Sequence, residues 1–359
     1  MVEENFEESL IEVIEPEESD SRGINYFEKL LPLWVFLCIV IGLLLSQLIP
    51  QISKAIEALQ IGDISIPIGI CLFFMMYPAM LNLQASELKK LGRNPKPIIL
   101  TIISNWLVAP FVGLAMINIF LPGNSETVRQ LSVAIILLSS SPCTAMVLVW
   151  GWMAKGNQEQ NVLNTSLNTI TIIFGYVGMV SLLTGIKNIP INAWLLLISL
   201  IFFIGLPLGL GIASKKLIVK SKGLDWFNNK YRPFVGKVSI IALLTTLIVL
   251  FSLNGDVLLH NPDYLLLVSV PLLVGFFIVV GYNILITKLT KLKYKEAVIT
   301  VIIGSSSHFE IAIATAVAMY GIGSVAALGT TMGLFWEVPV MLSLVYLGRY
   351  LQRRGFWKS

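Results

Sequence analysis

Residues 137–146 read LLSSSPCTAM, and residues 303–312 read IGSSSHFEIA. Each stretch places three consecutive serines in the middle of a long apolar run. A polar interruption inside a membrane-spanning helix leaves backbone groups unpaired at a cost of several kcal/mol each, unless a partner or a cavity compensates. The two stretches therefore predict two helix breaks that face a common partner or cavity.

The composition around these stretches indicates an integral membrane protein. Of the 359 residues, 56% are hydrophobic and only 13% are charged, which is too little charge to solvate a globular surface of this size. The apolar runs reach about 18 residues or more, the length of a membrane-spanning helix rather than of the alternating strands of an outer-membrane barrel. We therefore expect an all-α integral membrane protein.

Hydropathy predicts ten transmembrane helices, and the serine triplets fall in the fourth and the ninth. The expected spans are residues 32–50, 64–83, 97–120, 130–153, 161–185, 191–214, 237–254, 264–287, 296–319 and 324–348. Helices 4 and 9 are thus expected to be discontinuous.

Charge sets the orientation of these spans. With the N-terminus in the cytoplasm, all but three of the 25 Lys and Arg residues fall on the cytoplasmic side, and the exceptions are Lys54, Arg129 and Lys187. The positive-inside rule then predicts a multi-pass protein of the cell (inner or plasma) membrane with both termini in the cytoplasm. The net charge of +4 reflects this orientation and does not indicate nucleic-acid binding.

The chain divides into a tail and two halves. Residues 1–26 form an acidic cytoplasmic tail that lacks the basic start of a secretory signal; disorder and a surface helix both remain open for it. Residues 27–190 and 191–359 hold five expected spans each, and the spacing of the serine triplets aligns the fourth span with the ninth. Because five is odd, the second half crosses the membrane upside down, which predicts two inverted five-helix repeats typical of secondary transporters.

The first break contains a cysteine in a position suited to chemistry. Ser141 is suited to the N-cap of the second half-helix, Pro142 to its first position and Cys143 to its first turn. The exposed amides at such a helix start favour a thiolate, which is a soft ligand. Cys38 and Cys71 lie in uninterrupted apolar runs, so we expect them to be packing residues.

Two acidic residues, Glu310 and Glu337, lie well inside the expected spans, where a carboxylate is costly and usually functional. Ser307 and Glu310 have the spacing of a capping box, so Glu310 is open both to capping the half-helix and to binding protons or substrate. Glu337 precedes Pro339 and is expected to satisfy backbone freed by that proline or to share in proton coupling. His308 is expected to be a supporting residue of the wall.

Further polar side chains are expected to complete a substrate site at the breaks. Its predicted members are Cys143, Glu310, Ser140, Ser141, Ser306, Ser307, Asn105 and Asn168. Asn164 lies one helical turn before Asn168 and shares its face. Polar residues of neighbouring spans, among them Thr165, Thr330 and Thr331, are open to both interhelical hydrogen bonding and site lining.

The sequence resembles the Acr3-type arsenite efflux permeases of the bile/arsenite/riboflavin transporter superfamily. The resemblance rests on residues 141–150, SPCTAMVLVW, and on residues 308–345, which surround Glu310 and Glu337. It implies ten helices with crossed fourth and ninth helices, an essential cysteine at Cys143 and a ninth-helix glutamate at Glu310. It also implies export of trivalent arsenic, and sometimes antimony, driven by the proton gradient.

The chain departs from that family pattern at two places. An Asn is usual in the stretch where this chain has Ser307 and His308, and an acidic residue is usual where it has Asn157. These departures bear on substrate selectivity and on coupling more than on the fold.

We therefore expect an arsenite exporter that works by proton antiport, with Cys143 as the arsenic ligand and Glu310 and Glu337 as proton-coupling residues. Uncharged arsenite has a thiophilic centre that one thiolate can hold and release. We expect no cofactor and no enzymatic activity. Antimonite remains a possible substrate, and the oligomeric state remains open. The alternatives are a sodium-coupled organic anion symporter of the same superfamily and a membrane receptor that signals through the acidic tail.

Overall fold

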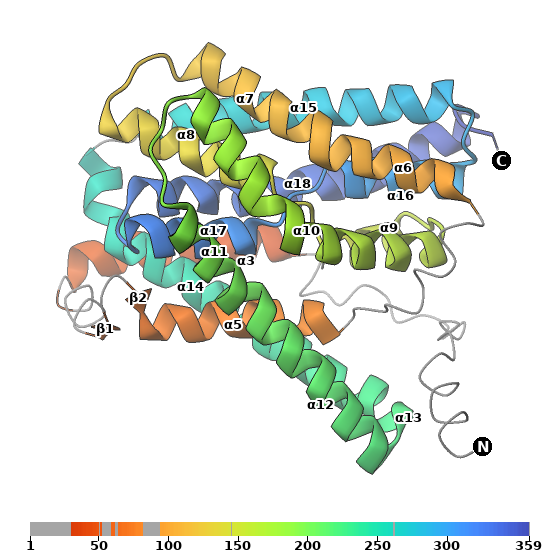
Figure 1. Ribbon diagram of the computed structural model, residues 1–359, viewed down its shortest axis with the longest axis horizontal. Coiled ribbons are helices and arrows are strands. Elements are labelled where there is room, and N and C mark those ends of the chain that lie inside the picture. Colours follow the sequence, from red (N-terminus) through yellow and green to blue (C-terminus); the bar gives the residue numbers. More distant parts are fainter. Residues whose placement is uncertain are drawn as a thin grey trace.

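The computed structural model describes residues 30–49, 51, 59–61, 64–81, 94–144, 146–260 and 263–358. Within these ranges the chain is almost entirely helical, as expected from its composition (Figure 1). The exception is a two-stranded antiparallel ribbon, β1 (Gln60–Ile61) and β2 (Ile64–Ser65), which the apolar pattern did not predict. The acidic tail, and with it the prediction for residues 1–26, lies outside the described residues.

The helices of the first half follow the expected spans. They are α3 (Leu31–Leu48), α5 (Ile66–Leu81), α6 (Pro95–Ile103) continued by η2 (Ser104–Val108) and α7 (Ala109–Phe120), α8 (Glu126–Ser139), α9 (Met146–Met153) and α10 (Gln158–Ile186). The expected fourth span is therefore two helices, α8 and α9, separated by an irregular segment. Its break lies at the first serine triplet, as predicted.

The second half repeats this pattern. Its helices are α11 (Ala193–Leu200) continued by η3 (Ile201–Gly205) and α12 (Leu206–Lys222), α13 (Leu224–Trp226) continued by η4 (Phe227–Tyr231) and α14 (Arg232–His260), α15 (Asp263–Leu289), α16 (Tyr294–Gly304), α17 (Phe309–Tyr320) and α18 (Val325–Arg353). The expected ninth span is again two helices, α16 and α17, separated at the second serine triplet.

Six helices in the described ranges are long and apolar enough to cross a membrane. They include the continuous helix Pro95–Phe120 and helices α10, α15 and α18. The other four expected spans correspond to the shorter helices α3 and α5 and to the two pairs of half-helices, so the count of ten crossings stays a prediction. Large apolar side chains such as Phe174, which is 81% exposed, cover the outside of the bundle and suit contact with lipid.

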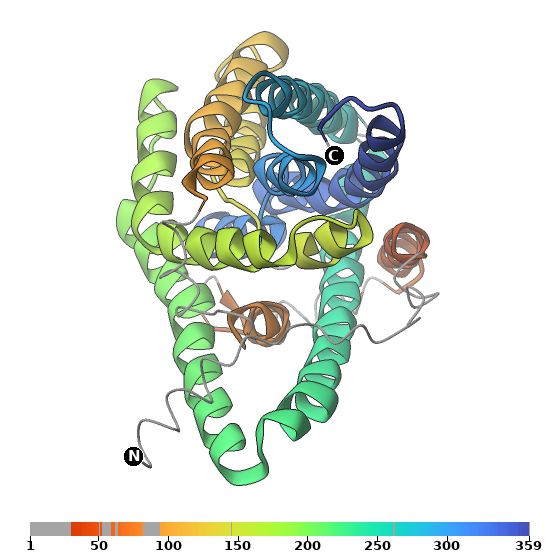
Figure 2. The same ribbon diagram turned by 90° about the vertical axis from the view of Figure 1, so that its right-hand side faces the viewer.

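The helices form two groups. In one group α14 packs against α3 and α5, and α5 packs against α12. In the other group α18 packs against α8 and α17, while α15 packs against α7 and α16 (Figure 2). The half-helices belong to the second group. The packing of α14 against α3 corresponds to that of α5 against α12 when the two halves are aligned, and the inverted repeat stays a prediction.

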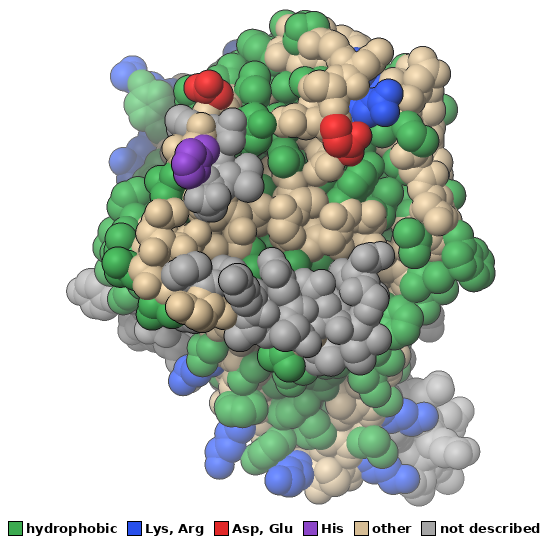
Figure 3. Space-filling model, turned by 90° about the vertical axis from the view of Figure 1, so that its left-hand side faces the viewer, with side chains coloured by type: hydrophobic (Ala, Val, Ile, Leu, Met, Phe, Trp, Pro, Cys, Tyr) green, Lys and Arg blue, Asp and Glu red, His purple; other side chains and the backbone are tan. Residues whose placement is uncertain are grey.

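The hairpin made by α12, α13 and α14 extends beyond the other helices as a lower lobe (Figure 2). Lys and Arg side chains gather on this lobe in the face shown in Figure 3, and hydrophobic side chains cover much of the rest of that face. Helices α12 and α14 run well past the expected spans, because hydropathy detects only the apolar part of a helix and their polar ends need no bilayer. The basic residues of this hairpin belong to the predicted cytoplasmic side.

Close packing between α8 and α18 holds the first half-helix in place, and it makes Gly329→Ala a test of the fold. A Cβ at position 329 would lie 2.8 Å from the Cβ of Ala134, a contact that no side-chain rotation relieves. We expect the substitution to destabilise the protein by about 1–3 kcal/mol. Thermal unfolding in detergent measures this. Gly281→Ala, which has open space at its Cβ, is the matched control and should not lower the melting temperature.

Candidate functional site

The two helix breaks cross and satisfy each other's backbone. Pro142 and Ser307 form an antiparallel bridge, and the His308 N–H donates to the Ser141 carbonyl at 2.6 Å. The Ser141 hydroxyl lies 3.1 Å from the Leu138 carbonyl and 3.3 Å from that of His308. The breaks therefore meet inside the bundle, and each provides hydrogen-bond partners that the other lacks in a membrane.

The helix caps expected at the breaks are wrong in detail. Helix α9 begins at Met146, so Ser141 and Pro142 lie in the extended crossing segment and Cys143 precedes the first turn. Helix α17 is preceded by His308, which makes no side-chain cap, and Ser307 does not form a capping box with Glu310. At the second break the backbone groups are bonded outside α17 instead: the Ser307 N–H donates to Glu337 and the His308 N–H donates to the Ser141 carbonyl.

Glu337 fastens helix α18 to the second break. Its carboxylate accepts hydrogen bonds from the hydroxyl of Ser306, from the hydroxyl of Ser307 at 2.6 Å and from the backbone N–H of Ser307 at 3.2 Å. The expectation that Glu337 serves backbone freed by Pro339 is therefore wrong. Glu337 is 2% exposed, and its carboxylate instead accepts the backbone N–H of Ser307, in the break between α16 and α17.

His308 connects the first break to Glu310. Its Nε2 lies 2.7 Å from the Thr144 hydroxyl, and its Nδ1 lies 2.9 Å from Glu310 Oε2. The His308 side chain is fully buried, whereas the Glu310 side chain keeps 9% exposure. Thr144 directly follows Cys143, so hydrogen bonds run from the neighbour of the cysteine to the intramembrane glutamate.

Two asparagines hold the main chain at the cysteine. Asn105, in the π-helical turn η2, donates to Asn168 Oδ1 at 3.1 Å, and Asn168 of α10 donates to the Cys143 carbonyl at 2.9 Å. π-Helical turns often occur at functional sites because they redirect side chains. Here the turn brings Asn105 into the bundle, and the pair fixes the backbone position of Cys143.

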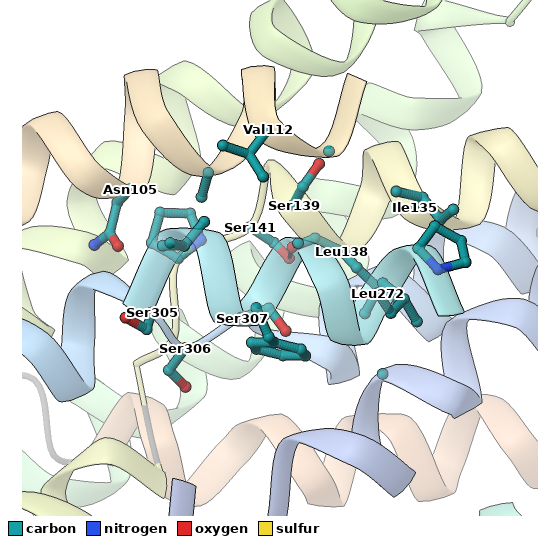
Figure 4. Close-up of a pocket in the computed structure, with 18 residues that line it drawn as sticks. Asn105, Val112, Ile135, Leu138, Ser139, Ser141, Leu272, Ser305, Ser306 and Ser307 are labelled. Atoms are coloured by element: carbon teal, nitrogen blue, oxygen red, sulfur yellow. Dashed lines mark hydrogen bonds between the residues drawn. The ribbon is translucent and has the colours of Figure 1, made fainter. Parts of the chain in front are cut away.

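A partly open cavity lies against the crossing, between α7, α8 and α15. One wall carries polar groups of both breaks and of η2, and the other is apolar, with Leu138 and Leu272 among its residues (Figure 4). Four of the predicted site residues line it: Asn105, Ser141, Ser306 and Ser307.

The remaining predicted site residues do not line this cavity. Cys143 is 1% exposed. Glu310 is 7% exposed and contacts His308. Ser140 is buried, and its hydroxyl has no hydrogen-bond partner among the described residues. The structure thus splits the predicted site into a serine wall at the cavity and a buried group around Cys143 and Glu310, with Asn105 and Asn168 joining the two.

Three residues of this network carry only weak signals in the sequence. Asn283 of α15 donates to Ser104 at 2.8 Å and to Ser305 at 3.0 Å, and Ser104 donates to the Gly304 carbonyl at 2.7 Å. The third is Thr144. The available signal was a single amide inside the apolar run of α15, and a hydroxyl next to the cysteine.

Other polar residues have local structural roles. Asn164 donates to Thr101 of α6 at 3.2 Å, an interhelical bond of the expected kind. Thr165, Thr330 and Thr331 instead bond carbonyls of their own helices. Asn157, where the family pattern has an acidic residue, caps α10 by accepting the Gln160 N–H at 3.1 Å. An asparagine caps a helix about as well as an aspartate, so this departure leaves the fold unchanged.

The described part of the chain contains no cluster of three His, Cys, Asp or Glu side chains that could hold a metal ion. None of the three cysteines, all of which lie in that part, forms a disulfide. Of these three cysteines, Cys143 is the one that lies in a break.

Crossed half-helices inside an all-helical bundle define a membrane transporter of the broken-helix type. The sequence profile of the Sodium Bile acid symporter family matches residues 69–261. Together with the relatives described next, this match shows that the chain belongs to that family, as an Acr3-type member of the bile/arsenite/riboflavin transporter superfamily.

Three relatives align along most of the chain. An uncharacterised transporter of Synechocystis sp. is 38% identical, over 97% of this chain and 94% of its own. The arsenical-resistance protein Acr3 of Alkaliphilus metalliredigens is 34% identical, over 91% of this chain and 93% of its own. The arsenical-resistance protein Acr3 of Corynebacterium glutamicum is 29% identical, over 93% of this chain and 91% of its own.

The bonds of Glu337 lead to a stability prediction. Glu337→Ala leaves the Ser307 N–H and two hydroxyls buried without their acceptor, and each such loss costs about 1–3 kcal/mol. We expect a clear drop in the melting temperature in detergent. Ser343→Ala, in the same helix and exposed, removes only a bond to its own helix and is the control. An equal effect of the two variants would contradict this role of Glu337.

Proposed function

We propose that this protein exports trivalent arsenic from the cytoplasm by proton antiport across the cell membrane. The observation that supports the proposal is the hydrogen-bond chain at the crossing: Thr144, the residue after Cys143, is linked through His308 to the intramembrane carboxylate of Glu310. Two relatives at 34% and 29% identity carry the name arsenical-resistance protein, and this supports arsenic as the substrate.

The chemistry of the crossing suits a neutral trihydroxide of arsenic. In the proposed step the Cys143 sulfur forms a bond to arsenic, and one hydroxyl leaves as water with the thiol proton. Hydrolysis reverses the step and restores both the thiol and the trihydroxide. A single sulfur holds the metalloid reversibly, whereas several sulfur ligands would hinder release. Antimonite has the same thiophilic chemistry and is a candidate second substrate.

The remaining members of the site have proposed roles that follow from their positions. Glu310 takes up the proton that is exchanged for the metalloid, because it is the less enclosed of the two buried carboxylates. Glu337 accepts hydrogen bonds from Ser306 and Ser307 in the second break, and through these bonds it contributes to proton coupling. The serine wall with Asn105 lines the approach from the cavity to Cys143.

A flux panel in everted membrane vesicles tests the proposal. We expect an imposed proton gradient to drive arsenite into the vesicles, and a sodium gradient to have no effect. Antimonite and a bile-acid-like anion are the comparison substrates. Because the family profile carries the name of sodium symporters, sodium-dependent uptake of the anion without arsenite flux is the result that would overturn the proposal.

A further inference from the structure

His308 links the two breaks more closely than a wall residue would. Its backbone N–H bonds Ser141, its Nε2 contacts the Thr144 hydroxyl, and its Nδ1 contacts Glu310. Both ring nitrogens are therefore engaged, in a side chain with no exposed surface. An imidazole held in this way can change the direction of both hydrogen bonds without moving.

The charge state of Glu310 determines which atoms donate in the two hydrogen bonds of the His308 ring. With Glu310 ionised and His308 neutral, Nδ1 must carry the imidazole hydrogen, because a carboxylate only accepts. Nε2 is then an acceptor, and the hydroxyl of Thr144 donates to it. Both lone pairs of the Thr144 oxygen stay available to a donor from outside the network.

One added proton reverses the hydrogen bond between His308 Nε2 and Thr144, whether it binds to His308 or to Glu310. If the pair becomes an imidazolium and a carboxylate, both ring nitrogens carry hydrogen. If Glu310 becomes a carboxylic acid that donates to Nδ1, the remaining imidazole hydrogen lies on Nε2. In both cases Nε2 donates to the Thr144 oxygen, and the hydroxyl hydrogen of Thr144 turns toward another acceptor.

The geometry points to His308 as a positioning residue that transmits protonation of Glu310 to the hydroxyl of Thr144, beside Cys143, so that proton and metalloid compete. This inference rests on the proposed function. A hydroxyl of a trihydroxide can donate or accept, and in the inferred pose one such hydroxyl donates to the Thr144 oxygen. After protonation Thr144 presents a donor and has one lone pair occupied, so the substrate is held less well.

The other titratable groups near the crossing are Cys143 on the first break and Glu337 on α18. Glu337 bonds Ser306 and Ser307, and it lies close enough to Glu310 for the two carboxyl groups to interact electrostatically. Helix α10 contributes Asn168, which carries no charge and bonds the Cys143 carbonyl. The pair of Glu310 and His308 is thus the titratable pair that is hydrogen-bonded to Thr144.

Exchange of labelled arsenite across vesicles with equal pH on both sides tests the inference, because no gradient then drives flux. In the unmodified protein we expect the KM for arsenite to rise as the pH falls, by up to about tenfold per pH unit where one proton competes. Thr144→Val keeps the shape of the side chain and removes the hydroxyl, so its KM should change less than about twofold between about pH 6 and pH 8. His308→Asn should show the same flat profile.

Thr144→Ser is the matched control, because it retains the hydroxyl and should retain the pH dependence. A flat profile in Thr144→Ser, or a profile in Thr144→Val or His308→Asn as steep as that of the unmodified protein, would overturn the inference. Failure of the proposed function gives a different result, since the unmodified protein would then show no arsenite exchange at any pH.

Discussion

Cys143→Ser is expected to reduce arsenite export into everted vesicles to the level of vesicles that lack the protein. Serine keeps the size and a hydroxyl of the side chain, but its oxygen is a hard ligand with little affinity for trivalent arsenic. The backbone of the crossing should survive, because the Cys143 carbonyl, and not its sulfur, accepts the hydrogen bond of Asn168. Unchanged membrane content and melting temperature would show that chemistry, rather than folding, is lost.

Cys38→Ser is the matched control for this substitution. Cys38 is also buried, at 6% exposure, but it lies within α3, outside the group of helices that contains the crossing. The control should cost some stability, because a hydroxyl replaces a buried thiol, yet arsenite export should remain. Export that persists in Cys143→Ser would refute the ligand role of the sulfur.

Glu310→Gln is expected to lower export driven by a proton gradient by at least about tenfold, equivalent to about 1.4 kcal/mol in the barrier. Glutamine keeps a hydrogen-bonding oxygen for His308 Nδ1, so the contact seen at 2.9 Å can persist. It cannot take up a proton, and exchange of proton for metalloid should therefore fail. Initial rates in everted vesicles with and without the gradient measure the effect.

Glu126→Gln is the control for the loss of a negative charge. Glu126 starts α8, is exposed and accepts a hydrogen bond from Gln130, so neutralising it leaves the crossing intact. Its export should match that of the unmodified protein. If Glu310→Gln retains full gradient-driven export, the proton is carried elsewhere, and Glu337 would be the next residue to replace.

The sequence predicted the positions of the breaks because the signal for them is local. Three serines inside a long apolar run disturb hydropathy at one place, whatever the remainder of the chain does. The prediction of the helix caps was wrong because capping depends on tertiary contacts, which are not local in the sequence. Whether the Ser307 hydroxyl accepts a hydrogen bond as a helix cap or donates one to Glu337 depends on which partner lies within about 3 Å, and the packing of α18 decides this.

His308 shows the same limit at the site itself. From sequence it was a supporting residue next to a helix start, and Thr144 carried no signal beyond its place after Cys143. The crossing brings the two within 2.7 Å of each other although they belong to different halves of the chain. Most buried polar groups are hydrogen-bonded, and here the partners come from segments far apart in the sequence.

The sequence by itself determined that the protein is an all-helical membrane protein, with helix interruptions at residues 139–141 and 305–307 and an intramembrane cysteine and glutamate beside them. Apolar runs and charge along the chain suffice for this, because transfer into a bilayer is summed over neighbouring residues. Only the tertiary structure decided that the breaks pair backbone to backbone, that Glu337 holds one of them and that His308 joins Thr144 to Glu310. Hydrogen bonds depend on distances of a few tenths of an ångström, which only the packing of helices far apart in sequence can set.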